Sequence, residues 1–364
     1  MSSSSTIFSG SYRSGDVSFL LKPLALASFV DVPQKEFLIQ SGQRHYSEML
    51  SPESLPSERY LEVFRQACAA NLERMARDCL TLATLIAQRR AGPVTLVSLA
   101  RAGTPVGVVL KHLLTRVLGR EASHYSVSII RDRGIDQVAL EHILALGHAS
   151  ESIVFVDGWT GKGVISRELG AAIAEFNERR GTAIDGGLYV LSDLAGSAAC
   201  AASCDDYLIP SSILNATVSG LVSRSILNDQ IGPGDFHGCV YYQQFEAHDQ
   251  SQRFADDLVA RASAIEPRPA APMDKAQAAA VSQAYMQAAM AQHGISDANM
   301  VKPGIGEATR VLLRRSPRLL IVRDAQAPEV AHLVLLAQEK DIPVQANLDL
   351  PYHAVSLIRS ALDG

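Results

Sequence analysis

The chain has 364 residues, 47% of them hydrophobic, which is enough for two or three domains with sizeable cores. Its formal net charge of −5 excludes a global attraction to nucleic acid, although a local basic patch is compatible with that balance. The cysteines lack paired metal-ligand spacing, which favours structural thiols over a zinc site.

The first residues and the apolar runs of the chain show no signal-peptide or membrane pattern. Residues 1–6 lack the basic start and the apolar stretch of a signal peptide. No apolar run approaches the roughly 18 residues that a membrane span needs. We therefore expect a reduced, cytoplasmic protein without membrane contact. The sequence leaves the oligomeric state open, and a dimer is compatible with it.

The repeating patterns divide the chain into segments. Residues 1–55 are irregular and are treated as an N-terminal extension. Residues 56–90 carry apolar side chains at three- and four-residue steps, which predicts a long amphipathic helix. Strand and helix patterns then alternate from residue 94 to about 209, which predicts a parallel sheet covered by helices. We expect residues 56–265 to form an α/β domain that binds ligands beyond the carboxyl ends of its strands.

The first strand pattern, residues 94–99, runs into a small turn with one arginine. Arg101, Ala102 and Gly103 precede an apolar helical stretch. A guanidinium at this point can clamp an anion, and a glycine lets the backbone approach it. The alternative is a solvated loop arginine.

A second, alternating strand at residues 125–130 ends in a charged turn. Arg131 and Arg133 follow it directly and could neutralise a phosphate when the turn closes over a ligand. The alternative is an ordinary charged surface turn.

The third strand pattern, residues 153–156, leads into the acid Asp157 and then into Thr160, Gly161, Lys162 and Gly163. A glycine-rich turn that opens a helix presents backbone N–H groups to a phosphate, and the carboxylate beside it can hold a sugar hydroxyl or Mg²⁺. The string matches neither the dinucleotide fingerprint nor a Walker A loop. A plain turn is the alternative.

The middle of the chain offers two further groups of candidates. A run rich in Ser, Thr and Asn includes Asn215, Ser219 and Arg224, which could line an acceptor pocket or simply cap helices. Further along, Cys239 lies two residues after His237, which suggests a thiol nucleophile with a base. His45 is another candidate base.

Residues 266–275 are rich in Pro and Ala, as linkers are, and residues 276–364 form a separate small unit. Its order of elements resembles the Pelota-type RNA-binding domain, a small α/β/α sandwich. By that resemblance, the residues expected to contact structured RNA are Lys302, Gly304, Gly306, Glu307 and Arg310. Arg314 shares a helix face with Arg310 and would extend a basic edge. The alternative is an accessory or dimerisation domain.

The Thr-Gly-Lys-Gly turn after Asp157 resembles the phosphoribosyl-pyrophosphate loop of type I phosphoribosyltransferases, and the turn at Arg101 resembles their pyrophosphate loop. The usual loop has two adjacent acids, whereas this one has only Asp157. The N-terminal strings at residues 9–13 and 45–50 complete a resemblance to phosphoribosyltransferase–Pelota proteins linked to tellurite-resistance (ter) operons. Some members of that family are labelled cysteine protease StiP.

The resemblance implies a type I phosphoribosyltransferase-like parallel-sheet domain and Mg²⁺-dependent transfer from phosphoribosyl pyrophosphate to a base-like acceptor. In this prediction residues 160–163 hold the 5′-phosphate, Asp157 holds the ribose hydroxyls directly or through Mg²⁺, and residues 101–103 hold the pyrophosphate. Two alternatives remain open: a cysteine-dependent hydrolase that uses Cys239, and a non-catalytic protein that binds a phosphoribosyl ligand and RNA.

Overall fold

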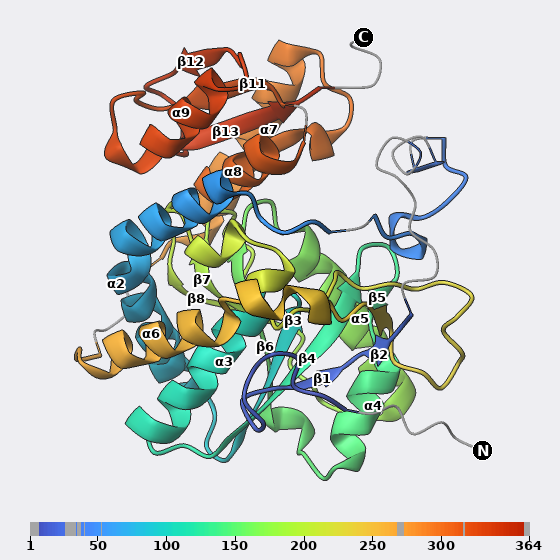
Figure 1. The fold of residues 1–364 in the computed structure, drawn as a ribbon. Coiled ribbons are helices and arrows are strands. Elements are labelled where there is room, and N and C mark those ends of the chain that lie inside the picture. Colours follow the sequence, from blue (N-terminus) through green and yellow to red (C-terminus); the bar gives the residue numbers. More distant parts are fainter. Residues whose placement is uncertain are drawn as a thin grey trace.

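The computed structural model describes residues 7–25, 34, 38–39, 41–51, 53–267, 273–315 and 317–359. Two α/β units follow one another, an N-terminal domain (residues 7–267) and a C-terminal domain (residues 273–359). Figure 1 shows the C-terminal domain, in orange and red, stacked on one end of the N-terminal domain. No helix within these ranges is long and apolar enough to cross a membrane.

A parallel sheet forms the centre of the N-terminal domain, as the sequence predicts. Every strand pair along its main path is parallel, and the short β5 (Gly134–Ile135) pairs antiparallel with β4. In spatial order the strands are β1 (Ser18–Leu20), β4 (Ala122–Ile130), β3 (Val94–Ala100), β6 (Ile153–Thr160), β7 (Leu188–Asp193) and β8 (Cys200–Ser203). The parallel α/β architecture is confirmed, whereas its assignment to the type I phosphoribosyltransferase class stays a prediction.

Helices cover both faces of this sheet, which explains why its strands read as nearly continuous apolar runs. Successive residues point to opposite faces, so Leu96 and Val97 enter two different cores. One core is closed by α2 (Glu58–Arg89), α3 (Thr104–His112) and α6 (Ser251–Ser263). The other is closed by α4 (Gln137–Ala145) and α5 (Val164–Arg180).

The long helix α2 agrees closely with the predicted range 56–90. Ser57 caps its N-terminus, because the Ser57 hydroxyl accepts a hydrogen bond from the backbone N–H of Tyr60. Residues 18–20, expected to be irregular, instead add strand β1 to the sheet edge.

Residues 207–242 form an irregular layer that we call the hood. Its last part contains β9 (Gly238–Cys239), which pairs in parallel with β2 (Lys22–Pro23). The hood touches the carboxyl ends of two strands, since Val222 accepts from Arg101 after β3 and His237 contacts Ser128 near the end of β4. It therefore covers the edge where ligands bind in sheets of this class.

The C-terminal domain is a four-stranded sheet flanked by helices. Only β12 runs parallel to its neighbour. The sheet order is β10 (Val301–Pro303), β13 (Ala354–Ile358), β11 (Pro317–Val322) and β12 (Val344–Ala346), with α7 (Lys275–His293), α8 (Ile305–Arg314) and α9 (Ala331–Gln338). Of the predicted linker, residues 268–272 lie outside the described residues.

Candidate functional site

The carboxyl ends of the central strands bring together most of the predicted site residues of the N-terminal domain. Arg101 directly follows β3, Arg131 directly follows β4, and Asp157 lies in the second half of β6. Parallel strands end at a common edge, which is why three residues from distant parts of the sequence meet there. The hood covers one part of this edge and the C-terminal domain covers another.

Arg101 is tied into the hood and the N-terminal segment. One guanidinium nitrogen lies 2.6 Å from a carboxylate oxygen of Glu53, with only 15% and 12% of the two side chains exposed. The same nitrogen donates to the carbonyl of Val222 (2.8 Å), and the second donates to the side-chain oxygen of Asn215 (3.2 Å). A carboxylate of the chain itself thus lies where an anion was expected. Sequence reasoning missed Glu53, which sits in a segment without a pattern.

The other hood candidates surround this ion pair. Arg224 donates to the carbonyl of Met49 and lies 5.6 Å above the ring of Tyr46, and burial lowers the pKa of its guanidinium. Ser219 donates to the carbonyl of Asn215 at 2.8 Å, so its hydroxyl shapes the turn. These contacts show that the Ser- and Asn-rich run folds around Arg101.

The candidate base His45 lies in the same segment as Glu53. Its Nδ1 contacts the Ser47 hydroxyl at 2.7 Å, while its buried Nε2 has no partner among the described residues. The Tyr46 hydroxyl accepts from the backbone N–H of Arg131 at 2.8 Å. The segment is thereby tied to the turn that follows β4, where Arg133 lies 3.4 Å from Glu48.

The turn at residues 101–103 packs on the sheet. Ala102 is exposed, but a side chain on Gly103 would come within 2.6 Å of the Val156 carbonyl. Gly103 therefore serves the close approach of this turn to β6.

A second acid, Asp193, fixes the start of the loop that follows Asp157. The Thr160 hydroxyl donates to the fully buried carboxylate of Asp193 at 2.6 Å, and backbone N–H groups of Ser197 and Ala198 donate to the same carboxylate. Gly163 adopts a left-handed φ of 68° where α5 begins, a conformation that glycine accepts without strain. The strand, turn and helix are as predicted, and Asp193 was missed although it ends an apolar strand run.

Asp157 and Lys162 of this loop face the C-terminal domain. The carboxylate of Asp157 accepts from the N–H of Gly158 (2.8 Å), and burial raises its pKa to about 7. The ammonium of Lys162 donates to the carbonyls of Ala298 (2.8 Å) and Val301 (3.2 Å). A side chain on Gly161 would lie 3.5 Å from the Pro303 carbonyl. The loop is therefore engaged by β10 and the turn before it.

The C-terminal residues expected at RNA line the other side of this contact. Glu307 lies 3.8 Å from the ammonium of Lys302 and 3.2 Å from the guanidinium of Arg310. Gly304 packs against Leu194. A side-chain carbon added at Gly306 would lie 3.5 Å from the indole of Trp159. The side chain of Arg314 lies outside the described residues.

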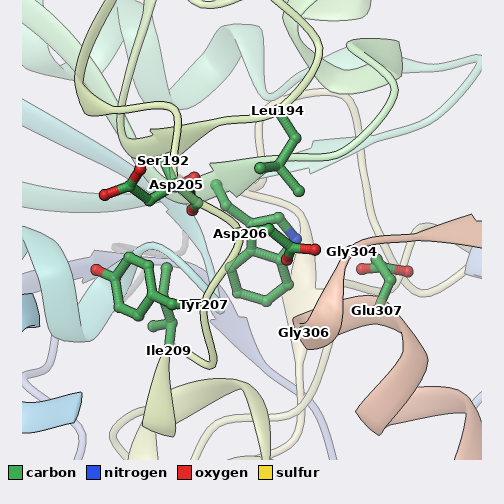
Figure 2. A pocket seen from close by; sticks show the side chains of 10 residues that line it. Ser192, Leu194, Asp205, Asp206, Tyr207, Ile209, Gly304, Gly306 and Glu307 are labelled. Carbon is green, nitrogen blue, oxygen red and sulfur yellow. Dashed lines mark hydrogen bonds between the residues drawn. The ribbon is translucent and has the colours of Figure 1, made fainter. Parts of the chain in front are cut away.

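Figure 2 shows how the two domains meet at a small cavity. Its volume is ≈ 10 Å³, about the space of one water molecule. Asp206 contributes to its wall, and its carboxylate accepts from the backbone N–H groups of Ile305 (2.7 Å) and His353 (2.8 Å). The two domains are tightly packed here, and the cavity between them is too small for an organic ligand.

The five cysteines are all free thiols and differ in exposure. Cys239 is fully buried, and burial raises the pKa of its thiol to about 12. Cys204 is exposed. Cys68 lines a cavity of ≈ 330 Å³ between α2 and α6, and burial raises the pKa of the Cys68 thiol to about 12. Within the described ranges no thiol forms a hydrogen bond with a histidine.

His237 is held firmly at the hood. Its Nδ1 contacts the Ser128 hydroxyl at 2.8 Å, and its backbone N–H donates to Asp136 at 2.6 Å. Burial lowers the pKa of His237 and raises that of Asp136, while the attraction between the two opposes both shifts. The imidazole is thus kept neutral at neutral pH, as a general base must be.

Comparisons with known proteins address the identity of both domains. A family model described as tellurite-like stress resistance cysteine protease StiP matches residues 10–259. A second, described as PELOTA RNA binding domain, matches residues 280–360. The chain is 42% identical over 366 residues to the cysteine protease StiP of Acinetobacter baylyi, which covers 97% of this chain and 94% of the relative.

These matches overturn the predicted phosphoribosyl transfer, together with its pyrophosphate donor and base acceptor, because the family and the relative are named as cysteine proteases. The structure supplies a physical reason: Lys162 of the expected phosphate loop binds the C-terminal domain, and Arg101 binds Glu53. Mg²⁺ at Asp157 stays a prediction, and the described residues contain no group of three or more His, Cys, Asp or Glu that could hold a metal ion. The chain belongs to the tellurite-like stress resistance cysteine protease StiP family and carries a Pelota RNA-binding domain at its C-terminal end.

Proposed function

We propose that the protein is a cysteine-dependent peptidase in which Cys239 supplies the nucleophilic thiol. The observation that carries this proposal is the 42% identity, over 97% of the chain, to a relative named as a cysteine protease. Cys239 is favoured over the other thiols because it is the cysteine with a histidine two residues away. The strand that bears it also lies at the carboxyl edge, where the candidate site residues gather.

His237 suits the role of general base in this proposal. In the tautomer whose Nδ1–H donates to Ser128, the nitrogen Nε2 is unprotonated and can take the thiol proton. The thiolate would attack the peptide carbonyl carbon, the C–N bond would break with the proton passing to the leaving amine, and water would then hydrolyse the thioester.

In this proposal the described conformation, with its buried thiol, is a resting state of the enzyme. Strand β2 pairs with β9, because the backbone N–H groups of Lys22 and Leu24 donate to the carbonyls of His237 (2.9 Å) and Cys239 (2.8 Å). Lys22 also forms an ion pair with Asp235 at 2.7 Å. The buried thiol must become accessible before it reacts, so we expect the part of the hood around β9 to open during catalysis.

Hydrolysis of a mixture of fluorogenic peptides by matched thiol variants tests the proposal. Cys239→Ser should lower the rate by at least about 10³-fold, the scale of losing a nucleophile. The control Cys204→Ser removes an exposed thiol and should retain the wild-type rate. Alkylation by iodoacetamide followed by mass spectrometry should label Cys239 in proportion to inactivation. Wild-type hydrolysis by the Cys239→Ser variant would remove Cys239 from the mechanism.

We also propose that the C-terminal domain binds structured RNA, because residues 280–360 match the Pelota RNA-binding model. Anisotropy of a labelled stem-loop RNA, titrated with the full chain at low salt, measures this directly. A folded protein without measurable affinity would contradict the proposal.

A further inference from the structure

Five cations from both domains gather where the domains meet, and we call them the junction cluster. Burial lowers the pKa of Lys162 to about 8, and Lys302 adds repulsion to that shift. Burial likewise lowers the pKa of Lys302, with further repulsion from its cationic neighbours. The positions of the side chains agree with this repulsion, because Lys162 donates to the carbonyl of Val301, next to Lys302, and both Lys302 and Arg310 contact the carboxylate of Glu307. The cluster consists of Arg131, Lys162, Lys302, Arg310 and Arg315.

Fewer negative charges face this cluster. Glu307 is the central acid, since it interacts with four of the five cations and its pKa is lowered by them despite burial. Asp297 faces Lys162, and Asp157 faces Arg310. Because the pKa of Asp157 is raised to about 7, it is only partly ionised at neutral pH. The junction therefore keeps an excess of positive charge although the whole chain carries a net charge of −5.

The two cations of the N-terminal domain are fixed in place by the C-terminal domain. The guanidinium of Arg131 donates to the side-chain oxygen of Asn299 at 3.2 Å, and the ammonium of Lys162 donates to two carbonyls of the same turn and strand. Neither contact supplies a negative charge. An ammonium has three donors and a guanidinium five, so both groups keep donors for an anion.

A flat aromatic group lies beside the cluster. Trp159 is partly exposed, and the guanidinium of Arg310 lies 5.9 Å from the centre of its ring. Cations that track a phosphate backbone, combined with an aromatic face on which a base can stack, are typical of surfaces that bind single-stranded or looped RNA. The junction has the cations of such a surface, whereas the ring of Trp159 packs against Gly306 and Arg310 and is close enough to report on binding nearby.

We propose that the junction cluster is one phosphate-binding surface for structured RNA, so that the N-terminal domain supplies two of its cations. RNA is the favoured ligand because the C-terminal half of the cluster belongs to a domain that matches an RNA-binding family. The surface recognises phosphodiester groups by charge. This inference rests on the RNA binding proposed above and does not depend on the peptidase chemistry.

The salt dependence of RNA affinity tests whether Lys162 contacts a phosphate. Each lost phosphate contact should reduce the slope of log K against log salt by about 0.7 to 0.9. For the full-length variant Lys162→Gln, the fall in affinity between about 50 and about 200 mM salt should therefore be about threefold smaller than for the wild type. The matched control Arg253→Gln removes a charge from α6, where the side chain is 81% exposed, and should keep the wild-type slope.

Two further measurements separate direct contact from an effect on domain packing. Asn299→Ala removes the Arg131 contact without changing any charge and should keep the wild-type slope; a slope reduced as in Lys162→Gln would overturn direct contact. Trp159 is the single tryptophan of the chain, so RNA at the junction should change the intrinsic fluorescence. RNA binding with unchanged emission, or an unchanged slope for Lys162→Gln, would overturn the proposal. Equal affinity for duplex DNA would overturn the assignment to RNA.

Discussion

At the scale of single residues, Asp157 links the sheet to the charge of the domain junction. Burial raises its pKa from 3.8 to about 7, against the lowering effects of the Gly158 N–H and Arg310. The native state therefore binds more protons than the unfolded chain between these two values. It follows that the stability contributed by protonated Asp157 is present at low pH and is lost as the pH rises from about 4 to about 7.

The variant Asp157→Asn should remove this pH dependence, because an amide does not ionise. Between about pH 5 and about pH 8, its free energy of unfolding should fall less than that of the wild type. The wild type and the variant should differ in this pH-dependent loss by on the order of 1 kcal/mol per pKa unit, reduced because the carboxyl group is partly exposed. Denaturant titrations at both pH values measure it, with Asp205→Asn, whose side chain is 56% exposed, as control. Parallel curves for Asp157→Asn and the wild type would contradict the account.

At the scale of elements, helix α3 packs on the sheet at a point where Gly107 faces the buried side chain of His124. A side chain at Gly107 would collide with the ring of His124. That ring cannot move easily, since it contacts the Ser98 hydroxyl at 2.8 Å and the Asp16 carbonyl at 3.0 Å. The contact between Gly107 and His124 therefore fixes the distance of α3 from the sheet, and with it the position of the turn at Arg101.

Alanine substitutions at two helical glycines should therefore have opposite effects. Gly107→Ala should destabilise the protein by about 1 to 3 kcal/mol, the usual cost of overpacking. Gly170→Ala on α5, where nothing lies within 4 Å of the added carbon, should stabilise it by about 0.5 to 1 kcal/mol through helix propensity. Thermal unfolding compares the two variants. A neutral Gly107→Ala would show that His124 can reorient.

At the scale of the whole molecule, local patterns predicted the long helix and the central strands but not the contacts between distant segments. The helix expected at 56–90 is found at Glu58–Arg89, and the strand expected at 94–99 is found at Val94–Ala100. Both were predictable because the buried face of a helix or strand requires apolar residues at a regular spacing in the sequence. The ion pair of Arg101 with Glu53 produces no pattern in the sequence, because it joins two segments that meet only in the folded protein. The loop after Asp157 was likewise recognised as a strand–turn–helix unit, yet its chemistry is decided by the domain that covers it.

Asp206 ties the two domains together, because its carboxylate accepts hydrogen bonds from two backbone N–H groups of the C-terminal domain. Asp206→Ala should weaken docking by about 1.5 to 3 kcal/mol for each charge-assisted hydrogen bond lost. Small-angle scattering should then show a more extended molecule, and Asp205→Ala should leave the wild-type profile. An unchanged profile for Asp206→Ala would show that other contacts suffice for docking.

Undocking also gives an independent test of the junction surface. In the extended Asp206→Ala protein, Arg131 and Lys162 would no longer lie beside Lys302, so RNA would lose up to two phosphate contacts. The slope of log K against log salt should fall by up to about 1.4 to 1.8 and further than in Lys162→Gln. The remaining slope would report the cations of the C-terminal domain. An extended molecule that keeps the full wild-type slope would place the whole RNA surface on the C-terminal domain.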